Sequence, residues 1–326
     1  GRVRAFLGEY GTGKTHLLEL IRQRAASRGF VTARVVLDPE ETAPSHPKRV
    51  YRELVRSLTY PDDPGHGLEP LLERAARNDR VIDELCVAER VRAREALEDG
   101  AHLYLTPALR YYRALALGER NGRKLEDAPG DEAIDYGLRL LVGWLEGHPT
   151  ISNTVIDDDL RHLVGRQGRI YSLMDYRPWA RIYGYLLSGL STLIRRVGYR
   201  GLVVLIDEAE FYALLSSQNR EYARILFKAL SWASVGGDGL VPFSRKALDL
   251  GGMGILKELP PRYGDDGGLY TVFAMTPDTD GVAALSGAVP EDDIVELSRL
   301  DIEDYRELAS RVVAHYRNAR PDGEIA

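Results

Sequence analysis

The chain has 326 residues, enough for two domains or for one large domain with an insertion. Hydrophobic residues make up 44% and charged residues 28%, which is typical of a folded globular protein, and no run of 18 apolar residues could span a membrane. The net charge of −6 argues against a nucleic-acid coat protein, and the single cysteine excludes a disulfide framework. We therefore expect a cytoplasmic protein with no membrane contact. Because the chain begins at Gly1, we expect it to be part of a longer gene product.

The first predicted element is a buried strand over residues 3–7, which leads directly into a glycine-rich loop. Residues 8–15, GEYGTGKT, match the pattern G-x-x-x-x-G-K-[ST], and apolar residues follow at helical spacing. Loop N–H groups and the helix N-terminus attract phosphate oxygens. We expect Lys14 to reach the β and γ phosphates and the Thr15 hydroxyl to bind Mg²⁺. The predicted nucleotide-binding residues are Gly8, Glu9, Tyr10, Gly11, Thr12, Gly13, Lys14, Thr15 and His16.

A strand over 31–37 and a helix over 48–58 continue a β-α-β-α order, which predicts a parallel sheet. That order then stops, and the next core strand comes near residue 202. The intervening region contains helical patterns at 68–78, 81–97, 105–117 and 131–145, so we expect a helical insertion. We predict a P-loop core in two parts, the insertion between them, and the start of a helical lid. Their ranges are 1–62 (core), 63–178 (insertion), 179–299 (core) and 300–326 (lid).

A second strong pattern is the buried strand 202–206, which ends in Asp207 and Glu208. Ligands of parallel α/β sheets bind beyond the carboxyl ends of the strands. We expect Asp207 to hold the Mg²⁺ ion, directly or through water, and Glu208 to activate the attacking water as a general base. A strand that ends in two solvated acids is the alternative. The paired acids favour hydrolysis over phosphate transfer by a kinase, which stays a weaker alternative.

Helices are expected over 179–197 and 219–233, before and after the acidic strand, and a glycine-rich loop with a helical turn near Ile255 follows. A third strand over 269–275 ends at Thr276. In the additional-strand ATPases, which include AAA+ proteins, a polar residue at this place senses the γ-phosphate, so we predict a catalytic role for Thr276. The alternative is a threonine that caps the strand. A last strand over 294–297 and a helix over 301–318 complete the prediction.

Charge is distributed unevenly along the chain. Eight arginines and only one acid lie between residues 160 and 200, with tyrosines and a tryptophan among them. Arginine and aromatic side chains together are typical of surfaces that bind nucleic acid, so Arg166, Arg169 and Arg177 are candidate nucleic-acid contacts. A solvated helix face is the alternative. Residues 277–298 contain no Lys or Arg, although many AAA+ ATPases supply an arginine to a neighbouring subunit from there.

The residues quoted so far resemble a known family. The segments GEYGTGKTHLLELIR, VVLDPEETAPSHPKRVYRELVRSL, DLRHLVG and GYRGLVVLIDEAE look like the BrxC/BrxD-type ATP-binding proteins of BREX bacteriophage-exclusion systems, over residues 2 to about 276. The resemblance implies an α/β fold of the P-loop NTPase class, AAA+-like, that works with other defence proteins. DNA and a second copy of the chain are further candidate partners.

The expected function is therefore Mg²⁺-dependent ATP hydrolysis in antiphage defence, with ATP and Mg²⁺ as cofactors. An ATP-gated scaffold, which binds ATP, turns over little and recruits partners, is the alternative from another class. The rate of phosphate release separates the two.

Overall fold

A computed structural model describes residues 2–86, 97–98, 100–120, 123–124, 129–148, 152–236, 259–264, 267–299 and 301–319 of the chain. A five-stranded sheet with the strand order β2-β5-β6-β1-β7 forms its centre, and every neighbouring pair is parallel. The strands are β1 (Arg2–Gly8), β2 (Val31–Val36), β5 (Leu202–Asp207), β6 (Leu269–Met275) and β7 (Ile294–Leu297). The sheet confirms the expected α/β class, and its strands match the five predicted ones.

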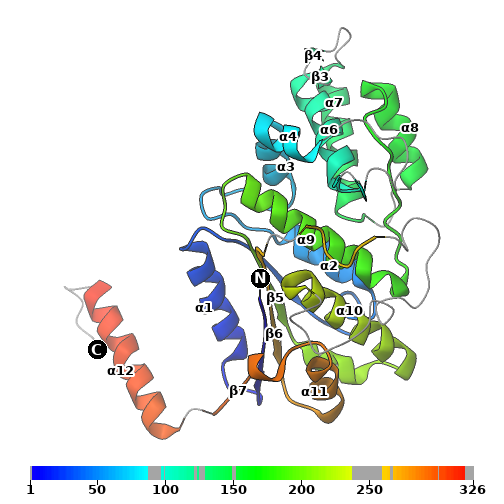
Figure 1. Cartoon of the computed structure of the whole chain (residues 1–326). Coiled ribbons are helices and arrows are strands. Elements are labelled where there is room, and N and C mark those ends of the chain that lie inside the picture. The colour runs from blue at the N-terminus through cyan, green and yellow to red at the C-terminus, as the bar shows by residue number, and fades with distance from the viewer. Residues whose placement is uncertain are drawn as a thin grey trace.

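Helices cover both faces of the sheet (Figure 1). Every residue of β5 is buried, and its side chains alternate between the two faces: Val203 and Leu205 pack with α1, whereas Leu202, Val204 and Ile206 belong to the larger core on the other face. The second face is covered by α2, α9 and α10. The bounds are α1 (Lys14–Ala26), α2 (Pro47–Arg56), α9 (Ala180–Arg196) and α10 (Ser217–Val235).

The expected insertion forms a helical group beyond α9 (Figure 1). Its helices pack on one another, and one continuous apolar core joins them to the sheet, from Leu141 in α7 to Val204 in β5. A short antiparallel ladder of β3 and β4 adds two small strands to a region expected to be entirely helical. The division of the chain into separate domains stays a prediction. The elements are α3 (Glu69–Ala76), α4 (Asp79–Leu85), α6 (Leu105–Leu117), β3 (Glu119–Arg120), β4 (Arg123–Lys124), α7 (Asp131–Leu145) and α8 (Asn153–Val164).

Helix α8 has a clear sequence signal that the prediction did not include. The Ser152 hydroxyl accepts a hydrogen bond from the backbone N–H of Val155, which caps the helix, and Ile156, Leu160 and Val164 are buried at four-residue spacing. The helix predicted over 81–97 corresponds to α4 at its start, and its predicted part over 87–96 lies outside the described residues. The predicted helical turn near Ile255 also lies outside them. The remaining elements are η1 (Arg177–Trp179), η2 (Ala209–Leu214), α11 (Thr279–Ser286), η6 (Glu291–Asp293) and α12 (Ile302–Ala319).

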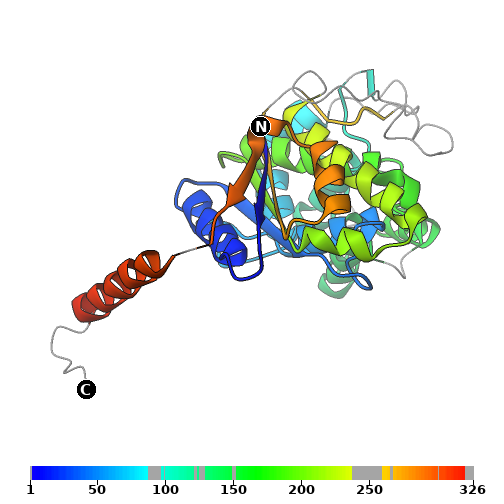
Figure 2. The ribbon, with the colours of Figure 1, turned by 90° about the horizontal axis from the view of Figure 1, so that it is seen from below.

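Helix α12 stands away from the rest of the molecule in both views (Figures 1 and 2). All described side chains from 301 to 314 are exposed. Among the described residues, no helix combines the length and the apolar character that crossing a membrane requires.

The parallel arrangement places the ends of all five strands at one edge of the sheet. β1 reaches Gly8, β5 reaches Asp207 and β6 is followed by Thr276 at this edge. Residues that are more than 190 positions apart in the sequence therefore meet there, and this is the edge at which ligands of such sheets bind.

Candidate functional site

The glycine-rich loop turns tightly between β1 and α1. Gly11 and Gly13 have φ angles of +83° and +85°, in the left-handed region that glycine adopts at little cost. The backbone N–H and the hydroxyl of Thr12 both donate to the carbonyl oxygen of Glu9, at 3.2 and 2.9 Å. These contacts hold the loop beside the first turn of α1, where unpaired backbone N–H groups can receive a phosphate.

The Lys14 ammonium group lies between the loop and the end of β6. Its Nζ atom donates to the Gly8 and Glu9 carbonyl oxygens, at 2.8 and 3.4 Å, and to Thr276 Oγ1 at 2.9 Å. Only 8% of the Lys14 residue is exposed. The Lys14 ammonium group thus connects the loop with Thr276 at the end of β6, two parts that the sequence analysis expected to act together.

Asp207 is almost completely buried at the end of β5, with 1% of its surface exposed. Its Oδ2 atom accepts a hydrogen bond from the Thr15 hydroxyl at 3.1 Å and pairs with the guanidinium group of Arg34 at 2.8 Å. The sequence analysis did not identify Arg34, although a charged side chain within a mostly apolar strand is an unusual feature. Because β2 lies beside β5, Arg34 compensates the buried charge of Asp207.

Thr15 and Asp207 fit the requirements of a Mg²⁺ ion. Two neighbouring ligands of an octahedral Mg²⁺ ion, each about 2.1 Å away, lie about 3 Å apart. The hydroxyl and carboxylate oxygens here are 3.1 Å apart. Within the described residues, no group of three or more His, Cys, Asp or Glu side chains could hold a metal by itself. Phosphate and water oxygens would have to supply the other ligands, as is usual for Mg²⁺ in nucleotide sites.

Glu208 has an unusual backbone conformation. With φ at 60°, it is the single non-glycine residue with a positive φ among those the structure describes. Such strained conformations concentrate at functional sites. Burial and the negative charges of Glu210 and Asp207 raise the pKa of the Glu208 carboxyl group, which the charge of Lys14 opposes. A raised pKa makes the deprotonated carboxylate a stronger proton acceptor.

Glu210 is a site residue that the sequence analysis missed. It lies in η2, directly after the predicted acidic pair, and its Oε1 atom accepts a hydrogen bond from the Thr276 hydroxyl. Lys14, Thr276 and Glu210 therefore form a continuous chain of polar contacts. The sequence signal was a second glutamate two positions after Glu208, but only the fold brings it to β6.

Two predicted loop residues point toward solvent. Tyr10 is 90% exposed, and His16 is exposed on the first turn of α1. Arg299, which follows β7, lies with its Nη2 atom 3.9 Å from Glu9 Oε2, so a cation lies beside the loop within the same chain. Arg299 is the first basic residue after the segment 277–298.

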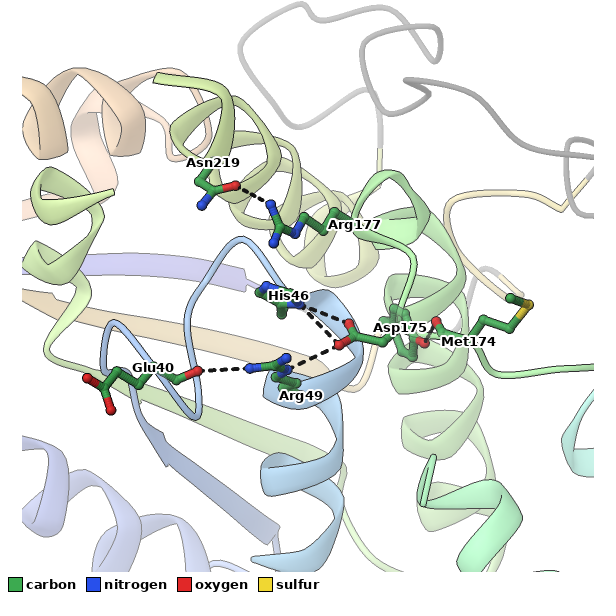
Figure 3. A network of polar contacts seen from close by, with 8 residues as sticks. Glu40, His46, Arg49, Met174, Asp175, Arg177 and Asn219 are labelled. Carbon is green, nitrogen blue, oxygen red and sulfur yellow. Dashed lines mark hydrogen bonds and ion pairs between the residues drawn. The ribbon is translucent and has the colours of Figure 1, made fainter. Parts of the chain in front are cut away.

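The three candidate nucleic-acid contacts lie apart from the polar chain around Lys14. Arg166 and Arg169 are exposed, and the guanidinium group of Arg169 stacks over the Tyr171 ring at 5.0 Å. Arg177 donates to the side chain of Asn219 in α10 at 2.6 Å (Figure 3). Their contact with nucleic acid stays a prediction.

Comparison with known proteins yields one match. The sequence model of a family described as "BREX system ATP-binding protein BrxC/D" matches residues 1–230. No curated protein and no solved structure matches the chain. The matched range includes the phosphate loop and both acids at the end of β5, whereas β6 and Thr276 lie beyond it.

Proposed function

The chain belongs to the BrxC/D family of BREX system ATP-binding proteins, and on that premise we propose that it is a Mg²⁺-dependent ATPase of antiphage defence. The observation that carries this proposal is the chain of contacts from Lys14 through Thr276 to Glu210, beside the Thr15–Asp207 pair. The lysine, the proposed Mg²⁺ ligands and the glutamates therefore lie together at the edge of the sheet where the strands end. Phosphate hydrolysis requires such a combination of groups.

The proposed roles follow from charge and position. Lys14 moves its hydrogen bonds from Thr276 and the loop carbonyls to the β and γ phosphates. Thr15 and Asp207 would hold Mg²⁺, which would neutralise phosphate charge when bound. Glu208 takes a proton from the attacking water as the new P–O bond forms and the bond to ADP breaks. The Thr276 hydroxyl, which donates to Glu210 in the structure, turns to donate its proton to the γ-phosphate. The products are ADP, inorganic phosphate and a proton.

The sheet order supports an AAA+-like architecture. β6 lies between the loop strand β1 and the acidic strand β5, which is the arrangement expected of an additional-strand ATPase. This order explains why Thr276 and Lys14 are in contact, since β1 and β6 are direct neighbours.

Substitution of Glu208 tests the hydrolytic role. Glu208→Gln keeps the size of the side chain but cannot accept the proton, so we expect ATP binding within about threefold of wild type and phosphate release at least about 100-fold slower. Lys14→Ala should lose ATP binding. Glu221→Gln, an exposed acid in α10, is the matched control and should keep wild-type turnover. Wild-type phosphate release by Glu208→Gln would refute the role of Glu208.

A second candidate is the ATP-gated scaffold, which the absence of Lys and Arg from 277–298 favours. It predicts tight ATP binding with negligible phosphate release, and recruitment of other BREX proteins. Measuring phosphate release with and without double-stranded DNA separates the candidates. Turnover stimulated by DNA would support an ATPase that acts on DNA, through Arg166, Arg169 and Arg177 or another surface. Dependence of turnover on protein concentration would indicate a homo-oligomer.

A further inference from the structure

A large groove lies at the β2 edge of the sheet, and Arg34 is one of its lining residues. It has a volume of about 910 Å³, and β2, α2 and the loop between them line it. Arg34 contributes to its wall while pairing with Asp207, so the groove adjoins the nucleotide site without including the phosphate loop. A volume of this size can hold several phosphate groups or a nucleotide.

Two cations in the groove have no hydrogen-bond or ion-pair partner among the residues that the structure describes. Lys48 is only 8% exposed, and the Nε atom of Arg52 is buried. Within the part of the chain that the structure describes, neither side chain forms a hydrogen bond or an ion pair. Burial lowers the pKa of Lys48, and the charge of Arg52 lowers it further, against the opposing effect of Asp175. Buried cations are normally paired, so this pair is suited to an anionic ligand.

Most acids that line the groove are already paired with groups other than Lys48 and Arg52. Asp38 accepts hydrogen bonds from the backbone N–H groups of residues 40–42, and Asp175 binds His46 and Arg49 (Figure 3). Glu53 lies 3.6 Å from Arg56. These three carboxylates are therefore not paired with Lys48 or Arg52.

Glu41 also lines the groove. Glu146 feels the charges of Arg52 and Arg56 but, within the described residues, forms no ion pair with either. The two free cations, Lys48 and Arg52, are therefore available to a ligand.

The cations are arranged as a row along α2. Lys48, Arg52 and Arg56 recur every four residues on one face of the helix and span about 12 Å at 1.5 Å per residue. A row of that length can follow successive phosphates of a nucleic-acid strand, each of which carries one negative charge. Arginine and lysine are also the side chains that bind phosphate best.

From the free cations, their spacing and the open groove, we infer that the α2 groove binds the phosphate backbone of nucleic acid, with Lys48 and Arg52 as its central contacts. The contact is sequence-independent, because it reads phosphates rather than bases. It does not require hydrolysis, so it can hold even if the proposed ATPase activity fails.

Fluorescence anisotropy of the full chain with a labelled 20-base-pair duplex tests the inference. We expect Lys48→Gln combined with Arg52→Gln to weaken binding at least about tenfold and to reduce the salt dependence by about two phosphate contacts. Arg24→Gln combined with Arg28→Gln removes the same charge from exposed arginines of the α1 segment and should change binding less than about threefold.

Further variants separate binding from folding. Because Lys48 is buried, its substitution can lower stability, so Arg52→Gln alone should weaken duplex binding at an unchanged Tm, and Arg52→Lys should restore it. Tripolyphosphate, added to the Lys14→Ala protein, identifies the source of the phosphate. Groove-dependent binding of tripolyphosphate without duplex binding would overturn the assignment to nucleic acid. If the Arg24 and Arg28 control pair weakened duplex binding as much as the Lys48 and Arg52 pair, the groove would not be the binding site.

Discussion

At the scale of single residues, the two acids at the end of β5, Asp207 and Glu208, are suited to different chemical roles. Asp207 is buried, pairs with Arg34 and accepts a hydrogen bond from the Thr15 hydroxyl, so it is suited to holding a metal ion together with Thr15. Burial raises the pKa of Glu208, and the negative charges of Glu210 and Asp207 raise it further. In many active sites, two neighbouring carboxylates lie in different environments, and each therefore takes a different catalytic role.

Substitution of Glu210 changes the pH dependence of the proposed reaction. The negative charge of Glu210 raises the pKa of Glu208, so Glu210→Gln should lower that pKa. A general base loses activity as pH falls through its pKa. In a plot of kcat against pH, the fall in activity on the acid side should therefore move to lower pH. The maximal kcat should be about tenfold lower, because the substituted amide would hold the Thr276 hydroxyl less firmly than the carboxylate does. A limb that stays in place or moves to higher pH would contradict the coupling, and Glu221→Gln should leave the profile unchanged.

At the scale of elements, a buried histidine organises the start of α6. His102 has no exposed surface, and its Nδ1 atom accepts hydrogen bonds from the backbone N–H groups of Tyr104 and Leu105, both at 3.1 Å. The ring stacks on Tyr185 of α9 at 4.2 Å between centroids. The two hydrogen bonds need an unprotonated Nδ1 atom and therefore a neutral ring, and the stacked ring joins the helical group to α9.

The stability of the fold should consequently depend on pH. Burial lowers the pKa of His102 to about 3, whereas an unfolded histidine has a pKa of about 6.5. Below about pH 6.5 the unfolded chain binds the additional proton, so the free energy of unfolding should fall by up to roughly 1.4 kcal/mol per pH unit. Urea unfolding at pH 7, 6 and 5 measures this slope. His102→Asn should flatten it, whereas His66→Asn, at an exposed position, should keep it. Equal slopes for wild type and His102→Asn would contradict this account.

At the scale of the whole molecule, α12 contributes little to the packed core. The apolar side chains that the structure describes in α12 are exposed, including Ile302, Tyr305, Leu308 and Val312. An isolated helix of this length is marginally stable in water, because tertiary packing supplies most helix stability. α12 is thus the element expected to exchange its amide hydrogens fastest.

Deletion of residues 301–326 tests this architecture. We expect the Tm of the remaining chain to stay within about 2 °C of the full chain, since no described side chain of 301–314 is buried. Leu141→Ala, in the continuous core, should instead cost about 2–5 kcal/mol and lower the Tm clearly. A loss of more than about 5 °C on deletion would show that α12 packs against the body in solution.

The sequence was sufficient for the features that depend on local pattern. Apolar runs predicted the five core strands, and the glycine spacing predicted the loop before α1. Periodicity also located α6 and α7 at their observed bounds. These features follow from side-chain period and backbone sterics, which operate over a few residues.

Tertiary structure alone decided which of these segments meet. The order β2-β5-β6-β1-β7 puts Arg34 beside Asp207 and Thr276 beside Lys14, and it places Glu210 within reach of β6. The α2 groove likewise exists because β2 is an edge strand beside which α2 packs. Local sequence determines strands and helices, but strand order is fixed by how their apolar faces are buried together, and that order determined which charged groups share a site.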